Sequence, residues 1–550
     1  MTLQQAELPT VAVAEPANVA EFVAEWAQRR PAATAAIEQA TGRRISFGEL
    51  GRNVAAIAAG LRARGICNGM RAVLAIKPGI EFVELVYAMF HAGAVPVVLD
   101  PGMGRKNLLA CIAEARAEAL VGIPLAHALS LRHRRAFGGL KHRVTVGRRW
   151  LWGGCTLAQL RATQDGDRSP PRTQPGDVAA VLFTSGATGV PKGVIYTHGI
   201  LARQTTMIRD AYGIQPGEVD VACFALFALF SVAMGVTIVL PAMDFSRPGR
   251  ADPAVICQAV REHKATMAFA SPAVWRKVGP WLEQRGETLP GLRRVLIAGA
   301  AVPFRTLEQL AGRIAPGGLV HTPYGATESL PVSTISSAEV LGETRSRTLQ
   351  GAGVCVGQPL PGVSVRVIAV YDGPLADLGK ARECRTGQVG EILVQSATTT
   401  RGYFGRPEAD ARSKIRDGEG FWHRMGDTGW LDELGRLWYC GRVAHTVWTS
   451  AGPLFPEQVE GVFAAQAGVA RCALVGVGAR GAQDPVLVVE RSPGSALAEG
   501  ELLALAALQP AAAAVTQVLF HPSLPVDVRH NAKIDREALS RWAAREVGSV

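Results

Sequence analysis

Residues 182–194 have the sequence Leu182-Phe183-Thr184-Ser185-Gly186-Ala187-Thr188-Gly189-Val190-Pro191-Lys192-Gly193-Val194, the most informative stretch of this chain. The apolar run 178–183 predicts a buried strand before it, and the run 194–196 predicts another after it. Glycines let backbone N–H groups approach an anion, hydroxyl groups add donors, and the lysine adds positive charge. We therefore predict a polyphosphate loop whose binding residues are Thr184, Ser185, Gly186, Thr188, Gly189 and Lys192.

This loop differs from a Walker A loop, because Val190 and Pro191 separate Gly189 from Lys192. A flexible surface turn is the alternative interpretation. The pattern Thr-Ser-Gly-x-Thr-Gly-x-Pro-Lys-Gly over residues 184–193 resembles a signature of the adenylate-forming enzymes. That family includes acyl-CoA synthetases, luciferases and nonribosomal adenylation domains. The resemblance implies an AMP-forming ligase that uses ATP and Mg²⁺, with Thr184 among the magnesium ligands.

Composition indicates a folded protein with more than one domain. The chain has 550 residues, of which 48% are hydrophobic and 19% charged. Its net charge of +11 invites a nucleic-acid or anionic-membrane partner, and part of that charge is concentrated in residues 132–149. No interleaved aromatic platform or known nucleic-acid motif accompanies this cluster. We expect a solvated basic face and no nucleic-acid partner, with a membrane surface or an acidic protein as the alternative.

Several features favour a cytoplasmic protein with no transmembrane segment. Any contact with a membrane is expected to be peripheral. The nine cysteines are scattered singly, which predicts reduced thiols and neither a zinc site nor a disulfide framework. Residues 1–5 lack the basic region of a signal peptide. The charge-free run 221–243 is long enough to span a bilayer, but it contains Gly235 and Pro241 and has acidic flanks. We predict a buried strand followed by a core helix there.

The order of the elements predicts an α/β fold. Helical spacing at 19–29, 46–61 and 81–91 alternates with strand-like runs at 72–76 and 94–99, which indicates a parallel sheet with crossover helices. After about residue 345, short strands and glycine-rich turns indicate a β-rich subdomain. We expect a large N-terminal domain, 1–441, that holds ATP and the acyl group. The remainder, 442–550, is expected to form a small α+β lid domain, whose mobility the resemblance implies.

Two further motifs fit the same family. The predicted strand ending at Leu296-Ile297-Ala298 runs into Gly299, Ala300 and Ala301, whose small side chains leave room for a flat ring. The sequence Tyr324-Gly325-Ala326-Thr327-Glu328 offers a ring to stack on a purine, a hydroxyl for phosphate and a carboxylate for Mg²⁺. A helix start capped by Thr327 and Glu328 is the alternative. The match to the family's second signature implies a catalytic role for Thr327 and Glu328.

Two more sites come from the C-terminal third of the chain. Asp427, interpreted as part of a glycine-bounded turn, can accept both ribose hydroxyls; the alternative is an aspartate that stabilises its own turn. The resemblance implies that role for Asp427 and a nucleotide-binding role for Arg442. It also implies that Lys533, in Ala532-Lys533-Ile534, reaches the acyl phosphate when the small domain closes.

Departures from the common family pattern narrow the expected substrate. The segment 224–230 is apolar and has no histidine, which favours an acyl pocket built from Phe224, Phe227 and Ala228, although plain core is the alternative. Ser450 stands where a lysine often serves thioester formation. His198 and His445 are candidates to accept a substrate proton, each equally a structural histidine.

The runs 321–332, 442–445 and 530–534 together resemble the OleC-type β-lactone synthetases of bacterial olefin biosynthesis. The resemblance implies a long-chain 2-alkyl-3-hydroxy acid that is activated to acyl-AMP and closed by its own β-hydroxyl to a β-lactone. It also implies association with the reductase and the β-lactone decarboxylase or hydrolase of that pathway. A fatty acyl-CoA or acyl-AMP ligase is the main alternative, and a non-catalytic nucleotide-binding regulator is the other.

Overall fold

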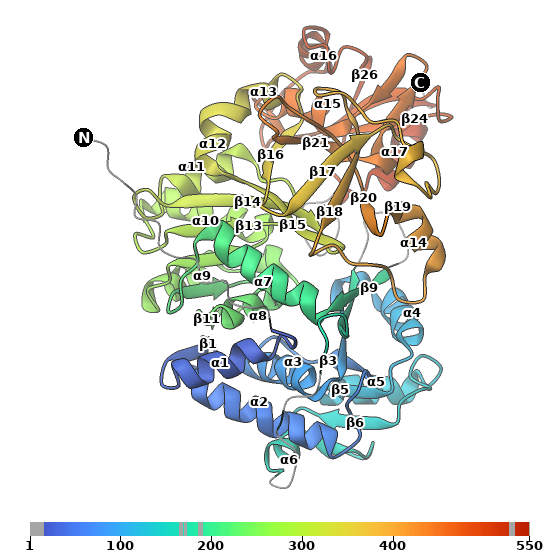
Figure 1. Cartoon of the computed structure of the whole chain (residues 1–550). Coiled ribbons are helices and arrows are strands. Elements are labelled where there is room, and N and C mark those ends of the chain that lie inside the picture. Colours follow the sequence, from blue (N-terminus) through green and yellow to red (C-terminus); the bar gives the residue numbers. More distant parts are fainter. Residues whose placement is uncertain (1–15, 164–168, 170–172, 185–190, 527–533, 549–550) are drawn as a thin grey trace, which may run out of the picture.

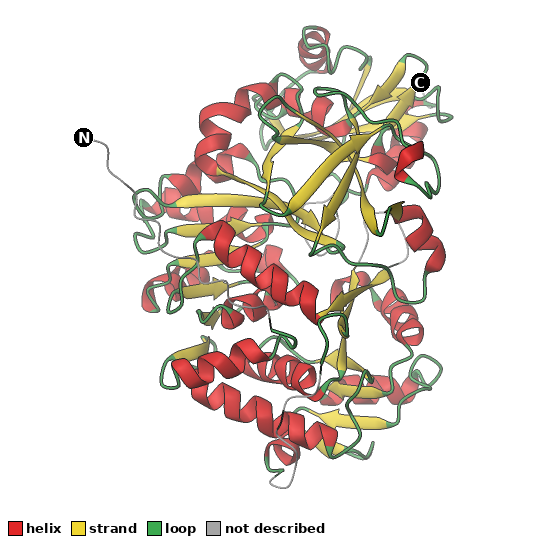
Figure 2. Ribbon diagram, viewed as in Figure 1, coloured by secondary structure: helices red, strands yellow, loops and turns green. Residues whose placement is uncertain are grey.

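The computed structural model describes residues 16–163, 169, 173–184, 191–526 and 534–548 (Figure 1). Helices cover the outer faces of the sheets, and twisted strands occupy the middle of the molecule (Figure 2). The α/β fold predicted from the sequence is confirmed.

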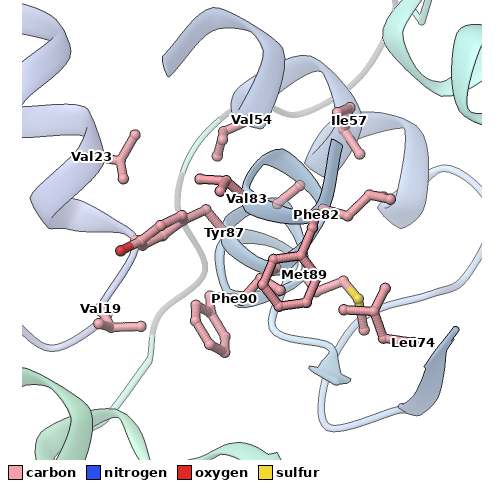
Figure 3. Close-up of a cluster of buried hydrophobic side chains, with 14 of the residues drawn as sticks. Val19, Val23, Val54, Ile57, Leu74, Phe82, Val83, Tyr87, Met89 and Phe90 are labelled. Atoms are coloured by element: carbon pink, nitrogen blue, oxygen red, sulfur yellow. The ribbon is translucent and has the colours of Figure 1, made fainter. Parts of the chain in front are cut away.

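The N-terminal helices form one layer over an apolar core. They are α1 (Glu21–Arg29), α2 (Phe47–Arg62) and α3 (Ile80–Ala92), close to the predicted ranges. Ser46 starts α2 with a capping box, in which Glu49 N donates to Ser46 Oγ at 3.2 Å and Ser46 N donates to Glu49 Oε2 at 2.8 Å. Figure 3 shows α3 packing its aromatic side chains against α1 and α2.

A seven-stranded sheet lies beneath these helices, in the order β7-β6-β5-β3-β4-β8-β9. All its pairs are parallel except the β8–β9 hairpin, which flanks the predicted phosphate loop. Its strands and associated helices are β3 (Arg71–Ala75), β4 (Val95–Leu99), α4 (Arg105–Ala115), β5 (Ala119–Gly122), α5 (Pro124–Arg132), β6 (His142–Thr145), β7 (Cys155–Thr156), α6 (Leu157–Arg161), β8 (Val178–Thr184), β9 (Lys192–Thr197) and α7 (His198–Tyr212).

The second sheet runs from a parallel half into an antiparallel half. The parallel half pairs β14, β13, β12, β10, β11 and β1 in that order, and β2 closes its edge. Its elements are β1 (Thr34–Glu38), β2 (Arg44–Ser46), β10 (Val219–Ala222), α8 (Ala225–Ala233), β11 (Thr237–Leu240), α9 (Pro253–Glu262), β12 (Met267–Ala270), α10 (Pro272–Arg285), β13 (Arg294–Ile297), α11 (Phe304–Ala311) and β14 (Leu319–Ala326).

The charge-free run 221–243 therefore contains the predicted strand and core helix, and a second strand, β11, follows the helix. Tyr87 ties this helix to α3, because its hydroxyl donates to the carbonyl of Leu229 at 2.7 Å. Across the described ranges, no helix has the length and apolar character needed to cross a bilayer.

The antiparallel half confirms the β-rich region expected after residue 345. Its path runs β14-β15-β16-β21-β20-β18-β17, with β19 beside β20. Its elements are β15 (Ser329–Ser336), α12 (Ser337–Glu339), α13 (Arg345–Leu349), β16 (Val354–Pro359), β17 (Val363–Ile368), β18 (Gly390–Ser396), α14 (Pro407–Ser413), β19 (Lys414–Asp417), β20 (Gly420–Leu431) and β21 (Leu437–Arg442).

The elements after Arg442 form sheets of their own. They are β22 (Val447–Thr449), β23 (Gly452–Leu454), α15 (Pro456–Phe463), β24 (Val469–Val477), β25 (Asp484–Arg491), α16 (Glu499–Ala507), β26 (Gln517–Phe520) and α17 (Arg536–Val547). Strands β24, β25 and β26 make a three-stranded sheet. Helix α16 ends at Ala507, three residues before Pro510, a residue that interrupts helices. All nine cysteines lie in described residues and are free.

Candidate active site

The motif Tyr324-Gly325-Ala326-Thr327-Glu328 spans the end of β14 and the two-residue turn of the β14–β15 hairpin. The alternative of a helix start is therefore wrong, since residues 329–336 continue as a strand. Gly325 is required by close packing, because a Cβ there would lie 2.8 Å from the carbonyl oxygen of Ser329. The hairpin therefore places the tyrosine, threonine and glutamate together at the carboxyl end of β14.

Tyr324, Asp427 and Arg442 form one connected group. The Tyr324 hydroxyl donates to Asp427 Oδ2 at 2.7 Å, and Arg442 Nη1 lies 3.1 Å from Asp427 Oδ1. The sequence had indicated a turn at Asp427, and this prediction is wrong. Asp427 lies inside β20 and faces Arg442 as its register partner on β21. Strand pairing therefore creates the ion pair, and Gly426 supplies a positive φ of 66° just before it.

Burial and charge fix the protonation of this group. The neighbouring Asp427 carboxylate, the largest influence, raises the pKa of Arg442, although burial opposes the shift. Burial and the same carboxylate raise the pKa of Tyr324 well above its usual range. A neutral phenol and a charged guanidinium therefore hold a carboxylate that is only 4% exposed.

Glu328 has a different set of partners. Tyr403 donates its hydroxyl to Glu328 Oε1 at 2.6 Å, and Lys192 Nζ lies 4.8 Å from the centre of the Tyr403 ring. The carbonyl of Thr327 accepts a 2.5 Å hydrogen bond from the hydroxyl of Tyr196. The structure thus brings Lys192, at the end of the predicted phosphate loop, together with Thr327 and Glu328.

Sequence reasoning missed Tyr196, Tyr403 and Lys414. Tyr403 lies in Gly402-Tyr403-Phe404-Gly405, an aromatic pair between glycines that was the available signal. Lys414 donates to the carbonyl of Thr400 and is buried, which lowers its pKa to about 8 although Glu328 opposes the shift. These three residues support the glutamate and the turn rather than form a motif of their own.

One large cavity of about 3460 Å³ is lined by most of the predicted site residues that the structure describes. A pocket for a drug-sized ligand is roughly 300–1000 Å³, so this cavity exceeds the volume that one such ligand fills. The predicted residues that line it are Lys192, Phe224, Phe227, Gly299, Ala300, Ala301, Tyr324, Gly325, Thr327, Glu328, Asp427 and Arg442. Residues from both large sheets and from both sides of residue 442 therefore border one space.

An apolar part of the cavity wall lies along α8. Phe227 stacks on Phe269 with ring centroids 4.0 Å apart, and Phe224 and Phe230 lie within 6.2 Å of these rings. Ala228, predicted to line the pocket, is 1% exposed, belongs to the core packed against α3 and is absent from the cavity wall. Because residues three apart share a face of a helix, Phe224, Phe227 and Phe230 lie together while Ala228 turns away.

Part of the predicted site lies outside the described residues: Ser185, Gly186, Thr188, Gly189 and Lys533. The backbone of Thr184 is described, and it pairs with Lys192 across the β8–β9 hairpin. Ile534 and Arg536 line the large cavity together with Asp427. Described residues that follow the predicted lysine in the chain therefore border the same cavity.

The two histidines differ. His198 is 2% exposed and its Nδ1 accepts a hydrogen bond from Val19 N at 3.3 Å, a structural position. His445 lines the cavity beside Arg442, and burial lowers its pKa to about 4, so it is neutral at pH 7. Of the two candidates, His445 borders the space where a substrate would bind.

Comparisons with known proteins agree with this geometry. The AMP-binding enzyme family model matches residues 23–404. An olefin beta-lactone synthetase from Stenotrophomonas maltophilia is 45% identical, covering 97% of this chain and 99% of its own. One from Xanthomonas campestris pv. campestris is also 45% identical, covering 91% of each. A similar solved structure is that of o-succinylbenzoate coenzyme A synthetase from Bacillus subtilis in complex with ATP and a magnesium ion. It superposes with a TM-score of 0.74 at 21% sequence identity, covering 94% of this chain and 98% of its own.

Proposed function

The chain belongs to the AMP-binding enzyme family, and from that premise we propose that it is a β-lactone synthetase. It uses ATP to activate a long-chain 2-alkyl-3-hydroxy acid and closes the product to a β-lactone. The observation that carries this proposal is the 45% identity to two olefin beta-lactone synthetases, over 97% and 91% of this chain.

The nucleotide would lie along the Tyr324–Asp427–Arg442 group. Asp427 accepts the ribose hydroxyls, because an ionised carboxylate offers several acceptor positions in a fixed place. Tyr324 stacks on the adenine, and Gly299, Ala300 and Ala301 leave room for that ring. The phosphate chain follows residues 184–192 toward Lys192, with Ser185, Gly186, Thr188 and Gly189 as donors.

The residues at the far end of this path fit a magnesium ion. Mg²⁺ prefers carboxylate and hydroxyl oxygens together with substrate phosphate, and Glu328 brings a carboxylate to the cavity wall, where Tyr403 contacts both Glu328 and Lys192. Glu328 would hold the ion, with Thr184 as a second ligand. When bound, Mg²⁺ neutralises charge on the phosphates. Thr327 and Lys192 bind phosphate oxygens directly.

Two bonds form in sequence. A carboxylate oxygen of the substrate attacks the α-phosphorus, the bond to the β-phosphate breaks, and pyrophosphate leaves. Lys533 stabilises the charge that develops there. The β-hydroxyl oxygen then attacks the activated carbonyl carbon, loses its proton, and AMP leaves with the bonding electrons.

An intramolecular attack suits this cavity. Holding a nucleophile against its target recovers roughly 7–11 kcal/mol of entropic cost, which helps to offset the strain of a four-membered ring. The ring stack of Phe224, Phe227 and Phe269 offers an apolar wall to the alkyl arms and keeps water from the adenylate. Ser450, exposed between β22 and β23, provides no cation for an incoming thiol.

We extend the proposal to the organisation of the reaction. Residues 1–441 hold the substrates and residues 442–550 act as a mobile lid that delivers Lys533. The enzyme works in the cytoplasm, at the surface of a membrane, beside a reductase that supplies the hydroxy acid. A β-lactone decarboxylase or hydrolase consumes the strained product.

Product analysis tests the function. The enzyme is incubated with ATP, Mg²⁺ and either the 2-alkyl-3-hydroxy acid or its β-deoxy analogue, with and without CoA. We expect lactone and AMP from the hydroxy acid without CoA, and bound acyl-AMP from the analogue. Efficient thioester formation from both acids would instead identify an acyl-CoA ligase.

A further inference from the structure

Residues 119–163 form a segment with unusual charge. They contain no aspartate or glutamate, so their eight basic side chains give a local charge of +8 within a chain of net charge +11. These side chains are Arg132, Arg134, Arg135, Lys141, Arg143, Arg148, Arg149 and Arg161. The segment forms the β7-β6-β5 side of the seven-stranded sheet together with α5, at the opposite end of the view from α16 and β24 (Figure 1).

Large apolar side chains protrude from the same segment. Leu151 is fully exposed, Leu125 is 72% exposed, Trp150 64% and Leu131 43%, and they make up most of the exposed large apolar side chains among the described residues. Single exposed leucines are ordinary, but several within 27 residues of sequence are not. The sequence predicted a solvated basic face here, and the structure adds exposed large apolar side chains to it.

A ring stack holds this apolar edge in place. His127 on α5 stacks on Trp152 at 5.3 Å, and Trp152 stacks on Trp150 at 5.9 Å. Trp152 also donates to Thr145 Oγ1 at 2.9 Å, from a loop that joins β6 to β7. Leu131 is one helical turn beyond His127, on the same side of α5. The loop thus presents Trp150 and Leu151 from a packed base.

The arginines around this edge are available to a partner. Within the described part of the chain, no carboxylate pairs with Arg132, Arg134, Arg135 or Arg148, and all four are exposed. Tryptophan and leucine side chains beside unpaired arginines are typical of surfaces that rest on anionic lipid. We propose that this face, Leu131, Trp150 and Leu151 with the four arginines, docks on an anionic phospholipid bilayer.

The cavity reaches the same side of the molecule. Ile123, Leu125, Leu129 and Val146 of this segment line the cavity that also borders Tyr324. On the proposed function, a long-chain acid can pass from the bilayer into the cavity along an apolar wall. Docking would thereby bring the cavity close to a lipid-dissolved substrate. The docking proposal itself rests only on the exposed side chains of this face and does not depend on the proposed function.

Vesicle sedimentation of the full-length protein tests the docking independently of turnover. Vesicles of phosphatidylcholine with 30% phosphatidylglycerol are compared with pure phosphatidylcholine at low and high salt. We expect binding to the anionic vesicles, weakened by salt. Each basic residue near an anionic surface contributes about fivefold to binding, so Arg134→Gln/Arg135→Gln/Arg148→Gln should lose on the order of 100-fold.

Two further variants separate the apolar and charged contributions. Trp150→Ser/Leu151→Ser should bind anionic vesicles at least tenfold more weakly, whereas Leu434→Ser/Leu508→Ser, which alters leucines exposed elsewhere, should bind as wild type. Arg44→Gln/Arg52→Gln/Arg541→Gln is the matched charge control. Equal vesicle binding by the patch and control variants would overturn the proposal. Binding to soluble polyglutamate without binding to anionic vesicles would also overturn it, in favour of an acidic protein.

Discussion

The hydroxyl of Tyr324 donates to the carboxylate of Asp427 over 2.7 Å, joining residues 103 positions apart in the chain. Tyr324 lies near the end of β14 in the large sheet, and Asp427 lies in the antiparallel half, where Arg442 completes the group. The contact fixes the carboxylate before any nucleotide arrives. Substitutions at Tyr324 and Asp427 should therefore change the affinity of the site for ATP.

Tyr324→Phe should raise the KM for ATP about tenfold, because a hydrogen bond to a charged group is lost while the ring remains. Asp427→Asn should raise it further and lower the thermal midpoint, since Arg442 then loses its ion-pair partner. Pyrophosphate release measures both. Tyr439→Phe is the matched control, because its ring lies 6.0 Å from that of Tyr324. If Tyr324→Phe and Tyr439→Phe have the same KM for ATP, the Tyr324 hydroxyl does not position Asp427 for nucleotide binding.

Glu328→Gln should shift the Mg²⁺ dependence of turnover to higher concentration while ATP binding changes less, because the substitution keeps volume and removes ligand charge. Tyr403→Phe removes the hydroxyl that donates to Glu328 at 2.6 Å and serves as the comparison. If Tyr403→Phe reproduces the whole effect of Glu328→Gln, the glutamate supports the turn instead of binding metal.

Asp220 predicts a pH dependence of stability. Burial raises its pKa to about 7, although a 2.7 Å hydrogen bond from Ser231 opposes the shift. Between pH 4 and 7 the folded state keeps a proton that the unfolded state has released. The free energy of unfolding therefore falls as pH rises through that window, by up to about 1.4 kcal/mol for each pH unit, and the loss is complete above pH 7.

The asparagine in the Asp220→Asn variant cannot ionise, so its free energy of unfolding should not show this fall between pH 4 and 7. Urea unfolding at pH 5 and pH 8 measures the effect, and the variant should gain stability relative to wild type at the higher pH. Ser231 can still donate to the asparagine oxygen, so the hydrogen bond is kept. An equal difference between the two proteins at both pH values would contradict the raised pKa.

Much of this architecture could be predicted from local patterns. The capping box at Ser46, the alternation of strands and helices, and the division of run 221–243 into strand and helix follow from spacing and propensity. Long-range pairing could not be predicted in this way. The register that sets Asp427 opposite Arg442 and the contact between Tyr403 and Glu328 depend on how distant strands meet, which leaves no local signal.

Lys533→Ala should reduce adenylation by about 10²–10³-fold at unchanged thermal stability, because a charge positioned at the transition state is lost. Lys106→Ala, at an exposed position on α4, is the control and should release pyrophosphate at the wild-type rate. Normal pyrophosphate release by Lys533→Ala would exclude the lysine from the first half-reaction.

Oxygen labelling tests the central claim, that the β-hydroxyl attacks an adenylated carboxylate. The substrate carries ¹⁸O in its β-hydroxyl group, and the lactone and AMP are analysed by mass spectrometry after one turnover without CoA. The account predicts that the lactone keeps the label as its ring oxygen and that AMP carries none. Label in AMP, with an unlabelled lactone, would show that the hydroxyl is the activated group and would contradict the account.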